Sequence, residues 1–205
     1  MGCAATGFDV ASGTNPRVPR AESTGLSGPA KRRARMSPEA LDGGSFSSDI
    51  QEFLRLLSAH EVRAVVVGGE AVIFYGHIRV TGDIDVFFDR APENAVRLYK
   101  ALEEFWQGDI PELEDTSDLE DQGVIFQFGI PPNRIDLLNE IDGVDFDTAW
   151  NGRTQVELRT ESGHFVVNYI GLEELVQNKE ASGRPKDLED LPFLLAARRG
   201  EQTDP

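Results

Sequence analysis

A run of β-branched residues that ends at two glycines is the feature that most constrains how this chain can fold. Residues 63–67 read Arg-Ala-Val-Val-Val, which is typical of a buried strand, and Gly68-Gly69 follow at once. Residues 70–75 can then begin a helix. The order of strand, glycine turn and helix indicates an α/β domain. The turn predicts a site where backbone N–H groups approach a phosphate, although tight packing is the commoner reason for such a pair.

The hydrophobic pattern of the rest of the chain continues this α/β order. We expect a helix at 48–60, where Ser48 and Gln51 have the spacing of a capping box. The other expected helices are 92–106, 172–181 and 185–198, and the other expected strands are 84–88, 124–130, 134–138 and the hairpin 154–158 with 164–167.

The length of 205 residues allows one domain of ordinary size with tails. Residues 1–45 are rich in Gly, Ser, Ala, Pro and Arg and are expected to form a disordered basic tail. The basic run 31–35 has the composition of a nucleic-acid contact or a targeting signal, but simple solvation is favoured. We expect the domain at 46–199 and a frayed C-terminus at 200–205.

Charge and composition exclude several classes of function. The net charge is -16, and the first 45 residues hold six Lys/Arg against four Asp/Glu, so the negative charge lies in the remainder. Such a surface repels phosphate backbones, which argues against long nucleic acid as a partner. No apolar run has the length of a membrane span. Cys3 is the only cysteine, which excludes an internal disulfide and fits a cytoplasmic protein.

Asp83 and Asp85 point most directly to chemistry. Side chains alternate along a strand, so these two carboxylates share one face while Ile84 and Val86 face the core. Two carboxylates at such a short separation repel each other unless a cation lies between them, and oxygen ligands suit Mg²⁺ or Mn²⁺. The pair therefore predicts a divalent metal site.

The glycine turn and the two aspartates belong to a longer pattern. Gly68-Gly69 precede residues 79–85, which read Arg-Val-Thr-Gly-Asp-Ile-Asp, and a third acid, Asp136, follows within Arg-Ile-Asp-Leu-Leu. This order resembles the nucleotidyltransferase superfamily of the DNA polymerase β type, in particular the minimal nucleotidyltransferases that include abortive-infection and toxin–antitoxin toxins. The resemblance covers about residues 47–198 and implies a small mixed α/β sheet flanked by helices, with helices at its C-terminal end.

The resemblance implies a two-metal transfer of a nucleoside monophosphate from an NTP to an acceptor hydroxyl. It places both ions on Asp83 and Asp85, and it assigns Asp136 to the ion beside the acceptor and to the proton of the acceptor. Mg²⁺ or Mn²⁺ is the implied cofactor and NTP the implied substrate. A small molecule, a protein side chain and an RNA end remain open as acceptors, as does a toxin role that a partner antitoxin protein neutralises.

Arg79, Thr81 and Lys179 join the two glycines as candidates for nucleotide contact. Arg79 and Thr81 stand just before the carboxylates, and either cation has the charge to neutralise a triphosphate. For Arg79 a surface ion pair with an acid explains the residue equally well, and for Lys179 ordinary surface exposure is favoured.

Two hypotheses of different classes fit this pattern. In the first, the chain is an active nucleotidyltransferase. In the second, it is a catalytically weak module on the same fold that binds a nucleotide or a partner. The retained pair Asp83 and Asp85 favours the enzyme, because an inactive scaffold has no need to keep two repelling acids on one face.

Overall fold

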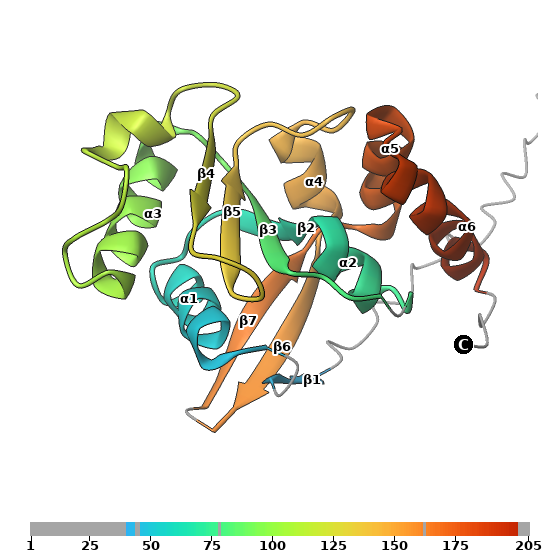
Figure 1. Cartoon of the computed structure of the whole chain (residues 1–205), viewed down its shortest axis with the longest axis horizontal. Coiled ribbons are helices and arrows are strands. Elements are labelled where there is room, and N and C mark those ends of the chain that lie inside the picture. Colours follow the sequence, from blue (N-terminus) through green and yellow to red (C-terminus); the bar gives the residue numbers. More distant parts are fainter. Residues whose placement is uncertain (1–39, 44–45, 78, 162, 201–205) are drawn as a thin grey trace, which may run out of the picture. The chain divides into compact units, whose positions relative to one another are not determined.

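The computed structural model contains a seven-stranded sheet in the order β1-β6-β7-β2-β3-β5-β4 (Figure 1). It describes residues 40–43, 46–77, 79–161 and 163–200. The strands are β1 (Ala40–Asp42), β2 (Ala64–Val67), β3 (Asp83–Phe88), β4 (Ile125–Phe128), β5 (Arg134–Leu138), β6 (Thr154–Thr160) and β7 (Gly163–Tyr169). The sheet mixes parallel and antiparallel pairs, which confirms the mixed α/β fold expected from the sequence.

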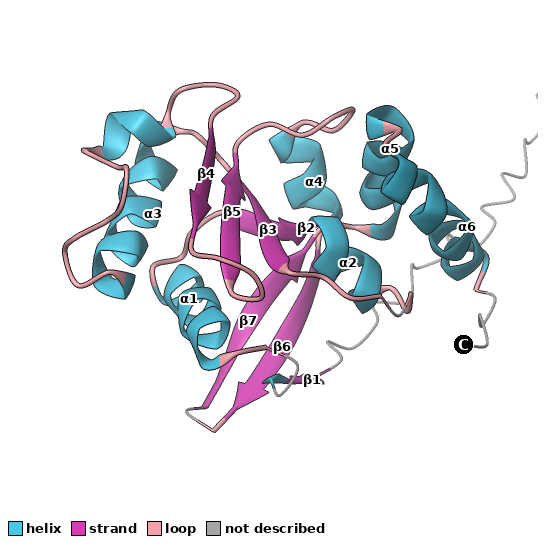
Figure 2. Cartoon of the chain, viewed as in Figure 1, coloured by secondary structure: helices cyan, strands magenta, loops and turns pink. Residues whose placement is uncertain are grey.

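Helices lie on both sides of the strands in the view of Figure 2, with α1 and α3 to the left and α2, α4, α5 and α6 to the right. Their bounds are α1 (Ser48–Ala59), α2 (Gly68–Phe74), α3 (Pro92–Phe105), α4 (Phe146–Gly152), α5 (Leu172–Ser182) and α6 (Pro185–Arg199), with a 3-10 helix at Thr116–Leu119. In the part of the chain that the structure describes, no helix is long and apolar enough to cross a membrane.

β2 and β3 lie in the middle of the sheet, and the burial of their side chains fits this position. All four residues of β2 are buried, as expected for a strand with neighbours on both edges and helices over its faces. β3 buries Ile84 and Val86, which are 2% and 1% exposed, while Asp83 and Asp85 stay partly exposed on the other face. The alternation expected at Asp83–Val86 is confirmed.

The start of α1 differs from the expected capping box by one residue. The N-cap is Ser47, whose hydroxyl accepts a hydrogen bond from the Ile50 N–H at 3.4 Å. The Gln51 side chain donates instead to the carbonyl oxygens of Gly43 and Phe46, both at 2.9 Å. Gln51 therefore links α1 to the segment that precedes it in the chain.

Besides the 3-10 helix, two elements were not expected from the sequence. Ala40–Asp42 pair in parallel with Glu157–Arg159, so the sheet begins inside the segment assigned to the tail, of which residues 1–39, 44 and 45 lie outside the described residues. Its partner strand is more than a hundred residues away, which local patterning does not reveal. Helix α4 has two turns and buries only Ala149 fully, so it lacks a readable period.

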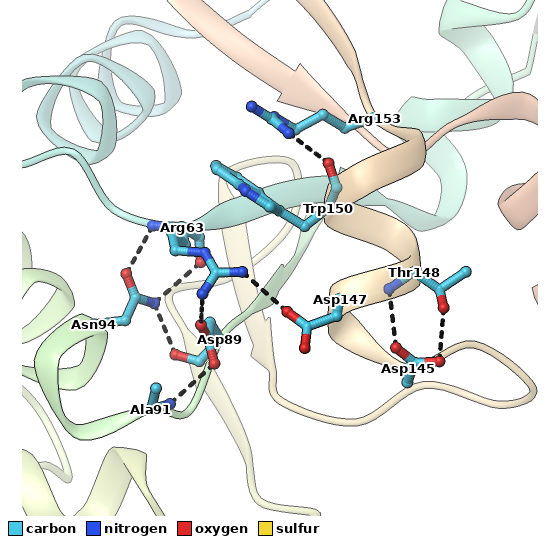
Figure 3. A network of polar contacts seen from close by, with 9 residues as sticks. All are labelled: Arg63, Asp89, Ala91, Asn94, Asp145, Asp147, Thr148, Trp150 and Arg153. Carbon is cyan, nitrogen blue, oxygen red and sulfur yellow. Dashed lines mark hydrogen bonds and ion pairs between the residues drawn. The ribbon is translucent and has the colours of Figure 1, made fainter.

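A polar network joins the ends of β2 and β3 that lie away from Asp83 (Figure 3). The Arg63 N–H donates to the Asn94 side-chain oxygen at 2.7 Å, and the Asn94 amide donates to the carbonyl oxygens of Arg63 and Asp89 at 3.0 and 2.7 Å. The Arg63 guanidinium pairs with Asp89 at 2.6 Å and with Asp147 at 3.0 Å. Asn94 is 2% exposed, so its amide replaces water for three backbone groups.

Replacing Asn94 with alanine is expected to lower the free energy of unfolding by about 2–4 kcal/mol, because buried backbone groups lose their partner. Urea unfolding monitored by circular dichroism measures this change. Asp147→Ala is the matched control: its carboxylate is 80% exposed, so the loss should stay below about 1 kcal/mol. Equal losses in the two variants would contradict a structural role for the Asn94 amide.

Candidate active site

Strand β3 is placed between β2 and β5, and the pairing with β5 brings three carboxylates to one face of the sheet. The two strands are parallel, with Asp85 opposite Asp136 and Asp83 opposite Arg134. Residues that are opposite each other on neighbouring strands project to the same face. Asp136 therefore lies beside the Asp83 and Asp85 pair, as the sequence predicted.

The glycine turn packs directly against these carboxylates. Val67, the last residue of β2, is opposite Asp85, so the turn follows at the level of the acids. Gly68 has φ +61°, and a Cβ on it would lie 1.9 Å from an Asp85 carboxylate oxygen. A Cβ on Gly69 would lie 2.8 Å from the Thr81 hydroxyl. Only glycine fits either position without displacement.

The expected phosphate-binding role of the two glycines stays a prediction. Gly69 is buried, and its backbone N–H interacts with the Asp85 carboxylate, which it stabilises in the charged form. The Thr81 hydroxyl is also engaged within the site, because it donates to the Asp83 carboxylate at 3.0 Å and lies 3.1 Å from the Asp83 carbonyl oxygen. These groups fix the positions of the two aspartates.

Arg134 is a site residue that the sequence analysis did not single out. Its Nε and Nη2 donate to the two oxygens of Asp136 at 2.9 and 3.0 Å, and Nη2 also donates to Asp83. Gln127 of β4 adds a hydrogen bond to Asp136 at 3.1 Å. The signal was the Arg-x-Asp spacing on one strand, which puts both side chains on the same face.

Burial and like charge disfavour the ionised form of Asp85. Desolvation, followed by the charges of Asp83 and Asp136, raises the pKa of Asp85 to about 6, and the charge of Lys179 acts in the opposite direction. Burial also raises the pKa of Glu70, on the first turn of α2, and Asp83 adds to the effect. Glu70 is thus a fourth acid close to the site.

Arg79 and Lys179, expected to contact nucleotide, are both held by acids of α6. The Arg79 Nη1 donates to the two oxygens of Asp190 at 2.9 and 2.6 Å. The Lys179 Nζ donates to Asp187 at 2.5 Å and lies 3.1 Å from Asp190. Lys179 and Asp190 are 5% and 2% exposed, so surface exposure, favoured for Lys179, is wrong. A nucleotide contact by either cation stays a prediction.

His77 lies in the same network. Its ring stacks on Phe193 of α6 with centroids 3.7 Å apart, and its Nε2 is 3.8 Å from Asp190. Asp190 is thus surrounded by His77, Arg79 and Lys179. The contacts of His77 and Arg79 join α6 to the loop that precedes Asp83. His77 and Arg79 lie about 110 positions before their partners on α6, which is why the sequence did not reveal these contacts.

The donor set fits a hard divalent cation. Asp83, Asp85 and Asp136 share one face and offer carboxylate oxygens, which are the ligands that Mg²⁺ and Mn²⁺ prefer. As the described side chains stand, no three acids, histidines or cysteines are arranged as a metal cage. Arg134 lies between Asp83 and Asp136 instead and provides the positive charge that these acids need.

The comparison with protein families agrees with this arrangement. A family model described as "Nucleotidyltransferase of unknown function (DUF6036)" matches residues 47–193, well over half of the chain. The chain belongs to this family of nucleotidyltransferases. The resemblance seen in the sequence is confirmed at this level. No curated protein matches the sequence.

The match to this nucleotidyltransferase family takes in every residue of the site. It begins at the N-cap of α1 and ends within α6, so it includes the glycine turn, the three aspartates and the Lys179–Asp190 contact. The α6 acids therefore belong to the same family segment as the carboxylates that they help to position.

The raised pKa of Asp85 predicts a pH-dependent stability for the metal-free nucleotidyltransferase. Because the folded pKa of about 6 exceeds the ordinary value of 3.8, Asp85 stabilises the fold most at low pH, and this contribution is lost as the pH rises through about 6. Asp85→Asn should therefore exceed the parent in free energy of unfolding by about 1–3 kcal/mol at pH 7.5 in EDTA, and should match it below about pH 4.

Unfolding of both proteins in urea with EDTA from pH 4 to 8 measures this difference. Asp136→Asn is the contrasting variant. It keeps the shape of the side chain but weakens two hydrogen bonds from Arg134, so it should destabilise the metal-free protein. An Asp85→Asn variant that is less stable than the parent at pH 7.5 would show that the carboxylate stabilises the fold.

Proposed function

We propose that this nucleotidyltransferase moves a nucleoside monophosphate from an NTP to an acceptor hydroxyl and depends on Mg²⁺ or Mn²⁺. The register of β3 and β5 supports the proposal, because it aligns Asp85 with Asp136 and leaves Asp83 on the same face. Three crowded carboxylates are costly for the fold unless cations neutralise them. A site that accepts divalent ions accounts for their retention.

Asp83, Asp85 and Asp136 would hold the ions, with Thr81 and the Gly69 N–H keeping the first two carboxylates in place. When bound, the ions would supply positive charge to the phosphate and to the attacking and leaving oxygens. Mg²⁺ and Mn²⁺ bind oxygen ligands, and the three aspartates that face this site provide carboxylate oxygens.

In the proposed reaction, the oxygen of the acceptor hydroxyl forms a bond to the α-phosphorus of the NTP. The bond from that phosphorus to the oxygen that bridges to the β-phosphate breaks, and pyrophosphate leaves with the electron pair. Asp136 takes the proton of the hydroxyl as general base. Asp136 is 5% exposed, so its position is fixed by the strand and by its hydrogen bonds.

A specific observation favours the second candidate, a nucleotide- or partner-binding module with little turnover. Arg134 lies among the carboxylates, and Arg79 and Lys179 are both paired with acids of α6. If these pairs never open, the site has neither room for ions nor a free cation for phosphate. Metal-dependent turnover distinguishes the two candidates.

Incubation of the purified protein with labelled NTPs and candidate acceptors is expected to show transfer in Mg²⁺ or Mn²⁺ and none in EDTA. Asp83→Asn and Asp136→Asn should reduce the rate on the order of 100-fold or more, because each removes a charge that holds an ion. Mg²⁺ with NTP should also raise the melting temperature of the parent and leave both variants unchanged.

The matched control is Asp147→Asn, an exposed acid in the network of Figure 3, away from the proposed metal ligands. It should keep the parent's rate and the parent's ligand-induced stabilisation. Ligand-induced stabilisation without any transfer would favour the binding module, and equal activity in Asp83→Asn and the parent would exclude these carboxylates from the reaction.

The toxin role implied by the family resemblance is a separate part of the proposal. Induced expression of the parent in a bacterial host should arrest growth, and Asp83→Asn should not, because the arrest requires transfer. Colony counts after induction, with protein levels matched by immunoblot, measure the effect. Normal growth with the active parent would remove the toxin role and the need for a partner antitoxin, while leaving the enzymatic activity intact.

A further inference from the structure

Arg134 occupies the place in the site that a divalent ion needs. Its guanidinium donates to both oxygens of Asp136, at 2.9 and 3.0 Å, and to one oxygen of Asp83. The guanidinium of Arg134 thus pairs with one acid of β3 and one acid of β5. A metal ion that bridges Asp83 and Asp136 would have to replace these three hydrogen bonds.

This inference rests on the proposed function. We propose that Arg134 is the internal counter-ion of the metal-free site, that binding of a divalent cation displaces its guanidinium, and that the displaced guanidinium then binds a phosphate group of the nucleoside triphosphate.

The position of Arg134 allows this exchange. Its side chain is 31% exposed, while that of Asp136 is 7% exposed, so the arginine enters the site from its solvent-facing side. An arginine side chain has several rotatable bonds, and its charged group is more weakly hydrated than that of lysine. It can therefore leave the carboxylates without leaving the mouth of the site.

The chemistry of the guanidinium explains why phosphate is the second partner. The planar fork that pairs with the two oxygens of a carboxylate also pairs with two oxygens of a phosphate. Once the acids bind metal, Arg134 loses its partners, and the incoming triphosphate is the strongest anion nearby.

The other cations near the site are less suited to this role. Arg79 and Lys179 are paired with Asp190, which is 2% exposed and packed within α6. Their partners are not the proposed metal ligands, so binding of metal would not release them. Among the cations that the structure describes, Arg134 is the one paired with acids that the metal would take.

Two binding measurements on the purified full chain test the exchange. The first is the affinity for Mn²⁺, measured by electron paramagnetic resonance after removal of metal with EDTA and dialysis. The second is the affinity for inorganic tripolyphosphate in saturating Mn²⁺, measured by calorimetry, which does not depend on the base of the nucleotide. The variants are Arg134→Gln and Arg134→Lys, and Arg63→Gln is the matched control.

Arg63 is a close match because it also pairs with two acids, Asp89 and Asp147, and its side chain is 34% exposed. We expect Arg134→Gln to bind Mn²⁺ about tenfold more tightly than the parent, since a competing positive charge has gone. It should bind tripolyphosphate about tenfold more weakly. Arg134→Lys should bind Mn²⁺ with intermediate affinity, because lysine keeps the charge without the fork. Arg63→Gln should match the parent in both measurements.

Opposite changes in the two affinities separate this role from a structural one, because a variant that only loosened the site would weaken both. Unchanged or weaker Mn²⁺ binding in both Arg134 variants overturns the inference, and so does an equal change in Arg63→Gln. Unchanged tripolyphosphate affinity overturns the phosphate step.

The same measurements distinguish failure of this inference from failure of the proposed function. If the parent binds Mn²⁺ and transfers nucleotide while the Arg134 variants bind Mn²⁺ as the parent does, the enzyme stands and the inference falls. If only Arg134→Gln binds Mn²⁺, the guanidinium blocks the site in the parent, so both the displacement step and the metal-dependent function fall. If neither protein binds Mn²⁺, both proposals fall.

Discussion

Repulsion among Asp83, Asp85 and Asp136 is the constraint on which the rest of the site depends. The parallel register of β3 and β5 brings their carboxylates to one face, and burial makes the charge of Asp85 costly. A chain with a net charge of -16, most of it outside the first 45 residues, has few cations to spare for such a face. Arg134 neutralises two of the acids, while Lys179 and the Gly69 N–H favour the charged form of the third.

The C-terminal helices α5 and α6 add a second group of ion pairs to this balance of charge. Asp190 on α6 holds Arg79, from the loop that leads into β3, and Lys179, from α5, together although these two cations repel each other. Buried ion pairs of this kind add little net stability compared with apolar packing, but removal of one partner is costly. Their consequence here is a fixed path for residues 79–82, and therefore a fixed entry of Asp83 into the sheet.

The sequence predicted those parts of the site that follow from local periodicity. Alternation along one strand put Asp83 and Asp85 on one face, and a strand around Asp136 has the expected bounds, Arg134–Leu138. Partners at long range were not predictable. Asp190 of α6 lies 111 residues after its partner Arg79, and Arg134 was not singled out beside Asp136. β1 was missed because three residues carry no period and the partner strand is far along the chain.

The glycine pair shows how the same residues restrict both the fold and the site. Gly68 adopts a positive φ and approaches Asp85 so closely that a single methyl group would overlap a carboxylate oxygen. The strand must turn at this residue for α2 to begin, and it turns at the level of the acids because Val67 is in register with Asp85. A larger residue would either move β2 from β3 or push Asp85 away from Asp136. The position of the Asp85 carboxylate therefore restricts this turn to glycine, in addition to the change of direction that α2 requires.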